Sequence, residues 1–233
     1  MLGSFLEVGL STTDIRVSCE FYERLGFGTA VTGDIWTHHY GVMTCRGLCL
    51  GLHELRRPSP WLALARENVA QLARELEAQR LSPSSARLGS EVFNELELRD
   101  PAGLVLRVLE ARSFSPPARV PPVTALGGFE ALSLPLRDFS VAEGFWERLG
   151  YPTRAHAEPW ATLQVEDLGL PLRYHAPKLH PEPLLLFSQQ DLGVAREVLA
   201  DLGLAAAPGL GGFGTPEHLL LESPEGLPIA LLA

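Results

Sequence analysis

The sequence predicts an α+β fold in which the element order β-α-β-β-β occurs four times along 233 residues. Two observations support this prediction. The two halves of the chain carry the same motifs in the same order, and within each half single helical patterns are separated by groups of short, strand-like apolar runs. The clearest match is between DIRVSCEFYERLGF, which starts at Asp14, and DFSVAEGFWERLGY, which starts at Asp138.

Further matched segments follow at a nearly constant offset. His53 in LCLGLHEL corresponds to His175 in LPLRYHAP, and DPAGLVL from Asp100 corresponds to SPEGLPI from Ser223. Collinear matches of this kind indicate an internal duplication, so both halves are expected to share one architecture.

Each half is expected to begin with an alternating strand, at 5–11 in the first half, followed by a helix. This helix begins after Asp14, a residue type that favours the N-cap, and ends at Gly26, the usual C-terminal glycine. The stripe expected to be buried on it consists of Val17, Phe21 and Leu25. Three strand-like runs follow, and a second unit then begins with a strand at 61–65 and a helix at 69–79.

A proline-rich segment separates the two halves. It reads SFSPPARVPPVTALGG, and its prolines and glycines disfavour a regular helix and favour a semi-extended linker. We therefore expect a first module at 1–112, a linker at 113–127 and a second module at 128–233.

Composition narrows the function classes. The chain has 19 Lys and Arg against 28 Asp and Glu, for a net charge of −9, which argues against nucleic acid or an anionic membrane as the partner. Three cysteines are too few for a disulfide framework, and Cys45 and Cys49 lie in an apolar run, as buried thiols do. There is neither a signal-peptide pattern nor a long apolar run. We expect a cytoplasmic protein, a monomer or homodimer, whose partner is a small-molecule ligand.

The helix-end and turn motifs resemble those of the vicinal oxygen chelate superfamily, which includes glyoxalases, bleomycin resistance proteins and extradiol dioxygenases. They are FYERLGF (21–27) with DPAG (100–103), and FWERLGY (145–151) with SPEG (223–226). The resemblance implies four βαβββ units that form two half-open eight-stranded barrels. It also implies a concave cleft that holds a metal or a flat organic ligand.

The resemblance further implies metal ligands at three points: on the first strand, at the head of the fifth strand, and on the strand after the DPxG turn. In the first module these points fall on Glu7, Trp61 and Arg107, and in the second on Ala131, Leu184 and Ala230. Of these side chains only Glu7 is a usual metal ligand, and one carboxylate cannot hold a catalytic ion. We therefore expect no metal and no other cofactor; a divalent metal is an alternative that is not favoured.

Charged and aromatic groups at the first module's three points suggest another use. We expect the Arg107 guanidinium to replace the cation, to pair with Glu7 and to stack on Trp61. One interpretation is a structural ion pair in a vestigial cleft. The other is a binding site for an acidic or aromatic molecule, with Arg107 as the anion anchor.

Trp36, His38 and His53 also belong to the expected ligand-binding site. Trp36, His38, His39 and Tyr40 form a cluster in the first module, and His53 follows on a later strand. Strand alternation sends His38 and His39 to opposite faces, so at most one of them faces the cleft. A metal held by one of these two residues together with His53 and Glu7 stays open as an alternative.

The second module offers Trp160, Gln164 and Arg173 as polar candidates, and it is expected to be the structural partner. The glycine-rich GLGGFG (209–214) neither follows a clear strand nor opens a helix, so we interpret it as a loop.

The leading functional hypothesis is a glyoxalase/bleomycin-resistance-like protein that binds a small organic molecule in the first cleft without the family metal triad. Whether it is an enzyme stays open at this point. One alternative is a metal-dependent lyase or extradiol dioxygenase with atypical ligands. Another is a resistance protein that sequesters a drug or metabolite, and a third is a structural module whose cleft is plugged by its own side chains.

Overall fold

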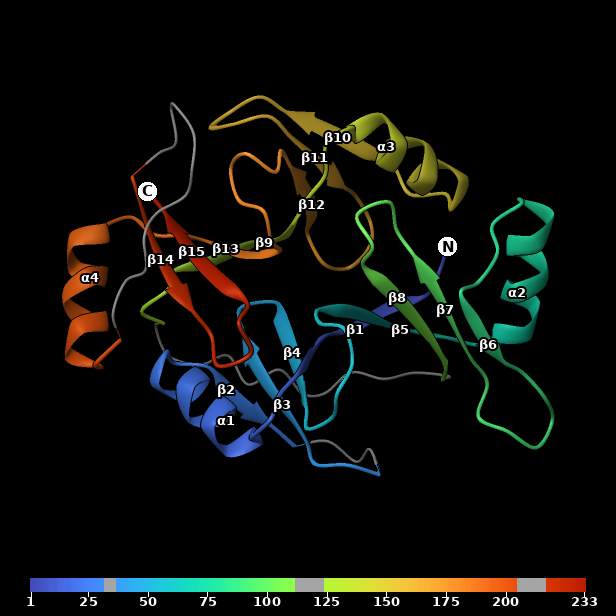
Figure 1. Cartoon of the computed structure of the whole chain (residues 1–233), viewed down its shortest axis with the longest axis horizontal. Helices are drawn as coiled ribbons and strands as arrows, with labels where there is room; N and C mark the ends of the chain where they lie inside the picture. The colour runs from blue at the N-terminus through green and yellow to red at the C-terminus, as the bar shows by residue number, and fades with distance from the viewer. Residues whose placement is uncertain (32–36, 112–123, 205–216) are drawn as a thin grey trace.

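The computed structural model describes residues 1–31, 37–111, 124–204 and 217–233. Two sheets dominate the fold, and Figure 1 shows the first below the second in that view. The first sheet has the strand order β2-β3-β4-β1-β5-β8-β7-β6. Its strands are β1 (Ser4–Ser11), β2 (Gly28–Ala30), β3 (Tyr40–Cys45), β4 (Leu48–His53), β5 (Trp61–Arg66), β6 (Ser85–Arg87), β7 (Glu95–Arg99) and β8 (Val105–Glu110).

The second sheet has the order β10-β11-β12-β9-β13-β15-β14. Its strands are β9 (Gly128–Pro135), β10 (Thr153–His156), β11 (Thr162–Val165), β12 (Leu172–His175), β13 (Leu184–Ser188), β14 (His218–Glu222) and β15 (Pro228–Leu232). The helices are α1 (Ile15–Arg24), α2 (Val69–Ala78), α3 (Phe139–Arg148) and α4 (Leu192–Asp201).

The predicted fold class is confirmed: the chain is α+β, and its βαβββ units form two half-open barrels. The first sheet has all eight strands, and the second has seven within the described residues. The GLGGFG segment, which the sequence predicts to be a loop, lies outside the described residues.

Helix α1 shows how local sequence sets an element. The Asp14 carboxylate accepts hydrogen bonds from the backbone N–H groups of Arg16 and Val17, which caps the helix, and the chain leaves it through Gly26 at a φ of +92°. The predicted buried stripe was partly wrong, because Val17 is 52% exposed. The buried face centres on Ser18, Phe21 and Tyr22, since residues spaced strictly four apart drift around a helix with 3.6 residues per turn.

Alternate strand residues of the first sheet face two different environments. Leucine and valine side chains of β1, β4, β5 and β8 turn toward the helices and join a hydrophobic core that runs continuously into the second sheet. The opposite, inner face of this sheet carries the polar residues considered below. Along each strand the two faces alternate, as a period of two requires.

Side-chain hydrogen bonds also connect the two halves of the chain. The Tyr22 hydroxyl of α1 donates to Glu225 in the turn before β15, at 2.9 Å. In the second half, Trp146 Nε1 donates to the Tyr174 hydroxyl at 2.6 Å, which donates to the Asp100 carboxylate at 2.7 Å. Each terminal turn therefore accepts a hydrogen bond from a tyrosine of the other half.

The linker predicted at 113–127 lies largely outside the described residues, so the module boundaries stay a prediction. Within the described part of the chain, no helix is both long and apolar enough to span a membrane.

Candidate functional site

Strand register places the three family positions of the first half on one face of the first sheet. Glu7 on β1 is paired with Ala63 on β5, which is paired in turn with Arg107 on β8. Trp61 is two residues from Ala63 and is paired with Gly9, so its side chain points to the same side. We call this surface the first inner face. The corresponding surface of the second sheet is the second inner face.

Two glycines make room for the large side chains of the first inner face. A Cβ atom added to Gly51 would lie 2.2 Å from Cδ of Glu7, and one added to Gly9 would lie 2.0 Å from Cε2 of Trp61. Both distances are far below van der Waals contact. Glu7 and Trp61 therefore lie flat against the sheet, over positions where a side chain cannot be accommodated.

The Glu7 carboxylate is buried, and both of its oxygens are hydrogen-bonded. The Tyr40 hydroxyl on β3 donates to Oε2 at 2.5 Å, and His53 Nε2 on β4 lies 2.8 Å from Oε1. His53 is 1% exposed and Glu7 is 6% exposed. These partners provide the hydrogen bonds that a buried carboxylate requires.

The hydrogen-bonded chain continues from His53 toward the surface. Nδ1 of His53 lies 2.9 Å from Nε2 of His38, which is partly exposed. Burial lowers the pKa of His38, and the nearby charges of His53, Arg107 and His39 lower it further, so its neutral form is favoured. His39 has a different partner, Glu54, at the surface and at 3.2 Å. Both histidines precede β3, so the strand alternation predicted for them does not apply.

Trp61 forms the wall beside this chain. Its indole is 1% exposed and its ring centroid lies 5.1 Å from that of His53. The cation expected over this ring was Arg107, but the guanidinium found there is that of Arg57, 4.5 Å from the centroid. Arg57 also donates to Glu97 at 2.9 Å, which holds it in place over the indole. Arg57 lies in the segment before β5, and no sequence pattern predicted its contact with Trp61.

Arg107 has a different carboxylate partner from the one predicted. Its guanidinium donates to Glu95 on β7, with 2.5 Å between Nη2 and Oε2, whereas Tyr40 and His53 hold the Glu7 carboxylate. Glu95 lies on the strand next to Arg107, while Glu7 is two strands away, about 10 Å at the usual strand spacing. The nearer carboxylate therefore forms the ion pair, and Arg107 and Glu95 are both partly exposed.

The cysteines near this face are unsuited to nucleophilic chemistry. Cys49 lies beside Glu7, and burial together with that carboxylate raises the pKa of the Cys49 thiol to about 12. Burial also raises the pKa of Cys45, which lies in the hydrophobic core as its apolar context predicted. Both residues are thiols rather than thiolates at neutral pH.

The three positions that the resemblance marks carry side chains of different chemistry. Glu7 is a carboxylate, but the indole of Trp61 and the guanidinium of Arg107 are not metal ligands. Among the described residues, no group of three or more His, Cys, Asp and Glu side chains is arranged to hold an ion. Trp36, also predicted for this site, lies outside the described residues.

The second inner face has a different character. Its three family positions and their neighbours form an apolar cluster: Ala131, Leu179, Leu184, Leu186, Leu220, Ala230 and Leu232. His175 is buried here, with Nδ1 2.7 Å from the Ser133 hydroxyl and Nε2 3.0 Å from the His180 carbonyl oxygen. Trp160 packs against the cluster, and Arg173 donates to Gln164 at 2.8 Å and lies 3.4 Å from Glu130.

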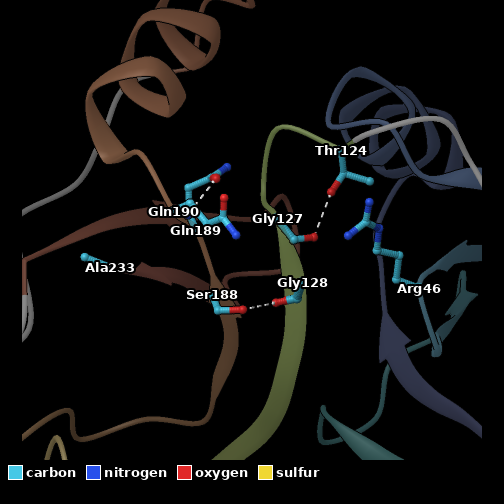
Figure 2. A pocket seen from close by; sticks show the side chains of 8 residues that line it. All are labelled: Arg46, Thr124, Gly127, Gly128, Ser188, Gln189, Gln190 and Ala233. Atoms are coloured by element: carbon cyan, nitrogen blue, oxygen red, sulfur yellow. Dashed lines mark hydrogen bonds between the residues drawn. The ribbon is translucent and has the colours of Figure 1, made fainter.

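A separate pocket of about 470 Å³ lies where β13 and the segment entering β9 approach Arg46 (Figure 2). It is lined by Arg46, Thr124, Gly127, Gly128, Ser188, Gln189, Gln190 and Ala233. In Figure 2 Arg46 extends toward Thr124, and the two glutamines lie on the opposite side. This pocket contains no residue predicted for the site.

Comparison with known proteins supports the fold. No protein-family model matches the sequence, and no curated protein matches it significantly. Among solved structures, the 2,3-dioxygenase LapB from Pseudomonas sp. KL28 has a TM-score of 0.63 at 11% identity, covering 98% of this chain and 91% of that one. A catechol 2,3-dioxygenase has a TM-score of 0.62 at 13% identity, covering 98% and 87%.

The Mn(II)-bound glyoxalase from Novosphingobium aromaticivorans gives a TM-score of 0.60 at 14% identity, covering 98% of this chain and 81% of that one. These identities are low, and the likeness extends over almost the whole chain. The protein therefore has the same fold as these two dioxygenases and this glyoxalase.

Proposed function

We propose that the protein binds a small organic acid on the first inner face. The observation that carries this proposal is the contrast between the two inner faces. The second is filled by an apolar cluster of its own side chains. The first has partly exposed polar groups, His38, Tyr40 and Arg107, above a buried floor made by Glu7, His53 and Trp61. Small-molecule sites typically combine aromatic side chains with a few precisely placed polar groups, as Trp61 and these polar side chains do.

Arg107 is the proposed anion anchor. Its guanidinium matches the geometry of a carboxylate, and its ion pair with Glu95 is partly exposed, so a ligand carboxylate can compete for it. Tyr40 and His38 provide aromatic faces near the buried floor, which suit a ligand with a planar group. The ligand class is therefore a small carboxylate with a planar or aromatic portion.

We further propose that binding requires no metal at the family positions. Arg107 places a fixed positive charge on the strand that would carry one of the metal ligands. An anionic ligand that a metal ion would hold in a relative would here be held by the guanidinium.

The test is a thermal-shift titration with benzoate, phenylacetate and 2-oxobutanoate, on protein treated with EDTA and on protein purified without chelator. A ligand that binds the folded protein raises its Tm. We expect a rise for at least one carboxylate, equal in both preparations, and at least a tenfold weaker affinity in Arg107→Gln.

Two matched arginine variants locate the site. Arg173→Gln changes the second inner face, and Arg46→Gln changes the pocket in Figure 2. Both should bind the ligand like the wild type. An undiminished response in Arg107→Gln, or loss of the response in Arg46→Gln alone, would contradict the proposal. A response that disappears with EDTA, together with stoichiometric Fe, Mn, Ni or Zn, would support a metal-dependent enzyme instead.

A further inference from the structure

Three side chains form a hydrogen-bonded chain from the interior to the edge of the first inner face. Glu7 and His53 are buried and 2.8 Å apart, and His53 and His38 are 2.9 Å apart. The chain is anchored at its inner end, because Tyr40 donates to the second oxygen of Glu7. Its outer end, His38, is partly exposed.

The chemistry of these groups sets the direction of the chain. A carboxylate only accepts hydrogen bonds, so His53 donates to Glu7 from Nε2. Neutral His53 then has its lone pair on Nδ1, and His38 donates to it from Nε2. In this tautomer, neutral His38 has its lone pair on Nδ1, so Nδ1 can accept a proton. The positive charge of the protonated ring is then stabilised by the hydrogen bonds through His53 to Glu7.

The equivalent histidine of the second sheet lacks this arrangement. His53 is paired with Ser11 in the register between β4 and β1, and His175 with Pro135 in the register between β12 and β9, so the two histidines occupy equivalent places. The His175 nitrogens are taken by a hydroxyl and a backbone carbonyl, neither of which is acidic or basic at neutral pH. A buried histidine at this position, such as His175, therefore needs only neutral hydrogen-bond partners. His53 instead contacts a carboxylate and a second imidazole.

We propose that Glu7, His53 and His38 form a proton relay in which His38 is the catalytic base for a bound 2-oxo acid, so that the protein catalyses keto–enol tautomerisation. This inference rests on the proposed binding of a small carboxylate at Arg107. His38 touches the substrate, while His53 and Glu7 act through it as positioning residues.

The reaction balances without an oxidant or a reductant. His38 Nδ1 takes a proton from the carbon next to the ketone, and the C–H electron pair becomes the C=C bond. The electron pair of the C=O π bond moves to oxygen, where the positive charge of Arg107 stabilises it. The His38 imidazolium then returns its proton to that oxygen, which gives the enol.

The charges around His38 suit this role. Arg107 is close enough to lower the pKa of His38, and the other groups that act on it are His53 and His39. A lowered pKa keeps His38 in the basic form at neutral pH. His53, which contacts His38, packs against Trp61, and Trp61 is paired with Val105, two residues from Arg107 on β8. The base and the anion anchor therefore belong to the same inner face.

The experiment follows exchange of the C3 protons of 2-oxobutanoate with D₂O by ¹H NMR, in the presence of EDTA. We expect the wild type to accelerate exchange in proportion to protein concentration and His38→Ala to reduce the rate at least 100-fold, the usual scale of general base catalysis. Added imidazole should restore part of the His38→Ala rate. His180→Ala, which changes a histidine of the second half, should keep the wild-type rate.

Variants of the positioning residues give a second readout. His53→Gln and Glu7→Gln should lower kcat with little change in KM and should shift the pH dependence of kcat, which a purely structural loss would not do. His38→Gln and thermal unfolding of every variant exclude misfolding as the cause.

Binding of 2-oxobutanoate without exchange above the buffer rate would overturn the relay and leave the proposed function intact. Exchange that is unaffected in His38→Ala, or not restored by imidazole, would also overturn it. If no carboxylate binds and no exchange occurs, both proposals fail.

Discussion

Nε2 of His53 lies 2.8 Å from Oε1 of Glu7, and both side chains are buried. A second glutamate–histidine pair, Glu54 with His39, lies close by at the surface, at 3.2 Å. The two pairs have the same chemistry and different burial. Because an unpartnered polar group is costly only where water is excluded, burial should decide how much each pair contributes to stability.

Glu7→Ala should therefore destabilise the protein, by about 2–4 kcal/mol, since it removes the acceptor of both His53 and Tyr40 and leaves a cavity. Glu54→Ala should change the free energy of unfolding by less than about 0.5 kcal/mol. Urea denaturation of the two variants at pH 7 measures both values. Equal effects would show that the buried pair contributes no more than the surface pair.

Gly9→Ala tests whether the close packing of Trp61 against the sheet is required. The added Cβ would lie 2.0 Å from the indole, so the ring must move, and we expect a loss of about 1–3 kcal/mol with a change in near-UV circular dichroism. Gly144→Ala in helix α3 is the matched control, because its Cβ would meet nothing within 4 Å. That variant should be stabilised by about 0.5–1 kcal/mol. A tolerated Gly9→Ala would mean that Trp61 has room to move.

The resemblance, rather than strand periodicity, predicted Glu7, Trp61 and Arg107 for the candidate site. The register of the sheet places all three on one face. The shared face follows from strand geometry, in which alternate residues point to the same side. His38 and His39 contact different partners, but both precede β3, so strand alternation does not explain their separation.

The partners of those side chains were harder to predict. A long guanidinium reaches several positions on neighbouring strands, and sequence did not reveal that Glu95 would be nearer to Arg107 than Glu7 is. Arg57 lies outside the strands, so no periodicity pointed to its place over Trp61. One usable signal was missed: Gly9 and Gly51 alternate in phase with Glu7 and His53, and glycines at inward positions indicate large side chains packed across them.

Asp100 should make stability fall as pH rises. Burial raises the pKa of this carboxyl to about 6, although Tyr174 and the Leu104 N–H donate to it. Unfolding returns the pKa to about 3.9, so the folded protein binds more protons between these values. The contribution is fully present below the unfolded pKa and is lost as pH rises through about 6.

Comparison with Asp100→Asn isolates this effect. The free energy of unfolding of the variant relative to the wild type should increase between pH 4 and pH 8, by on the order of 3 kcal/mol. Urea denaturation across that range gives the difference. The hydrogen bond that Asp100→Asn loses changes the free energy of unfolding equally at every pH, so it does not affect the pH dependence. A difference between variant and wild type that stays the same from pH 4 to pH 8 would contradict the raised pKa.

His175 should make the free energy of unfolding fall as pH falls, the opposite of the effect of Asp100. Burial lowers its pKa to about 4, whereas an unfolded histidine titrates near pH 6.5. The folded protein then binds fewer protons between these values, so the contribution is present above about pH 6.5 and is lost as pH falls toward 4. The expected loss is on the order of 3 kcal/mol. His175→Gln removes the titrating group and should lose less stability over this window than the wild type does, while His39→Gln, at the surface, should follow the wild type. An NMR titration of the His175 ring checks the cause directly, because a midpoint near 6.5 in the folded protein would leave no proton-linked contribution at this position.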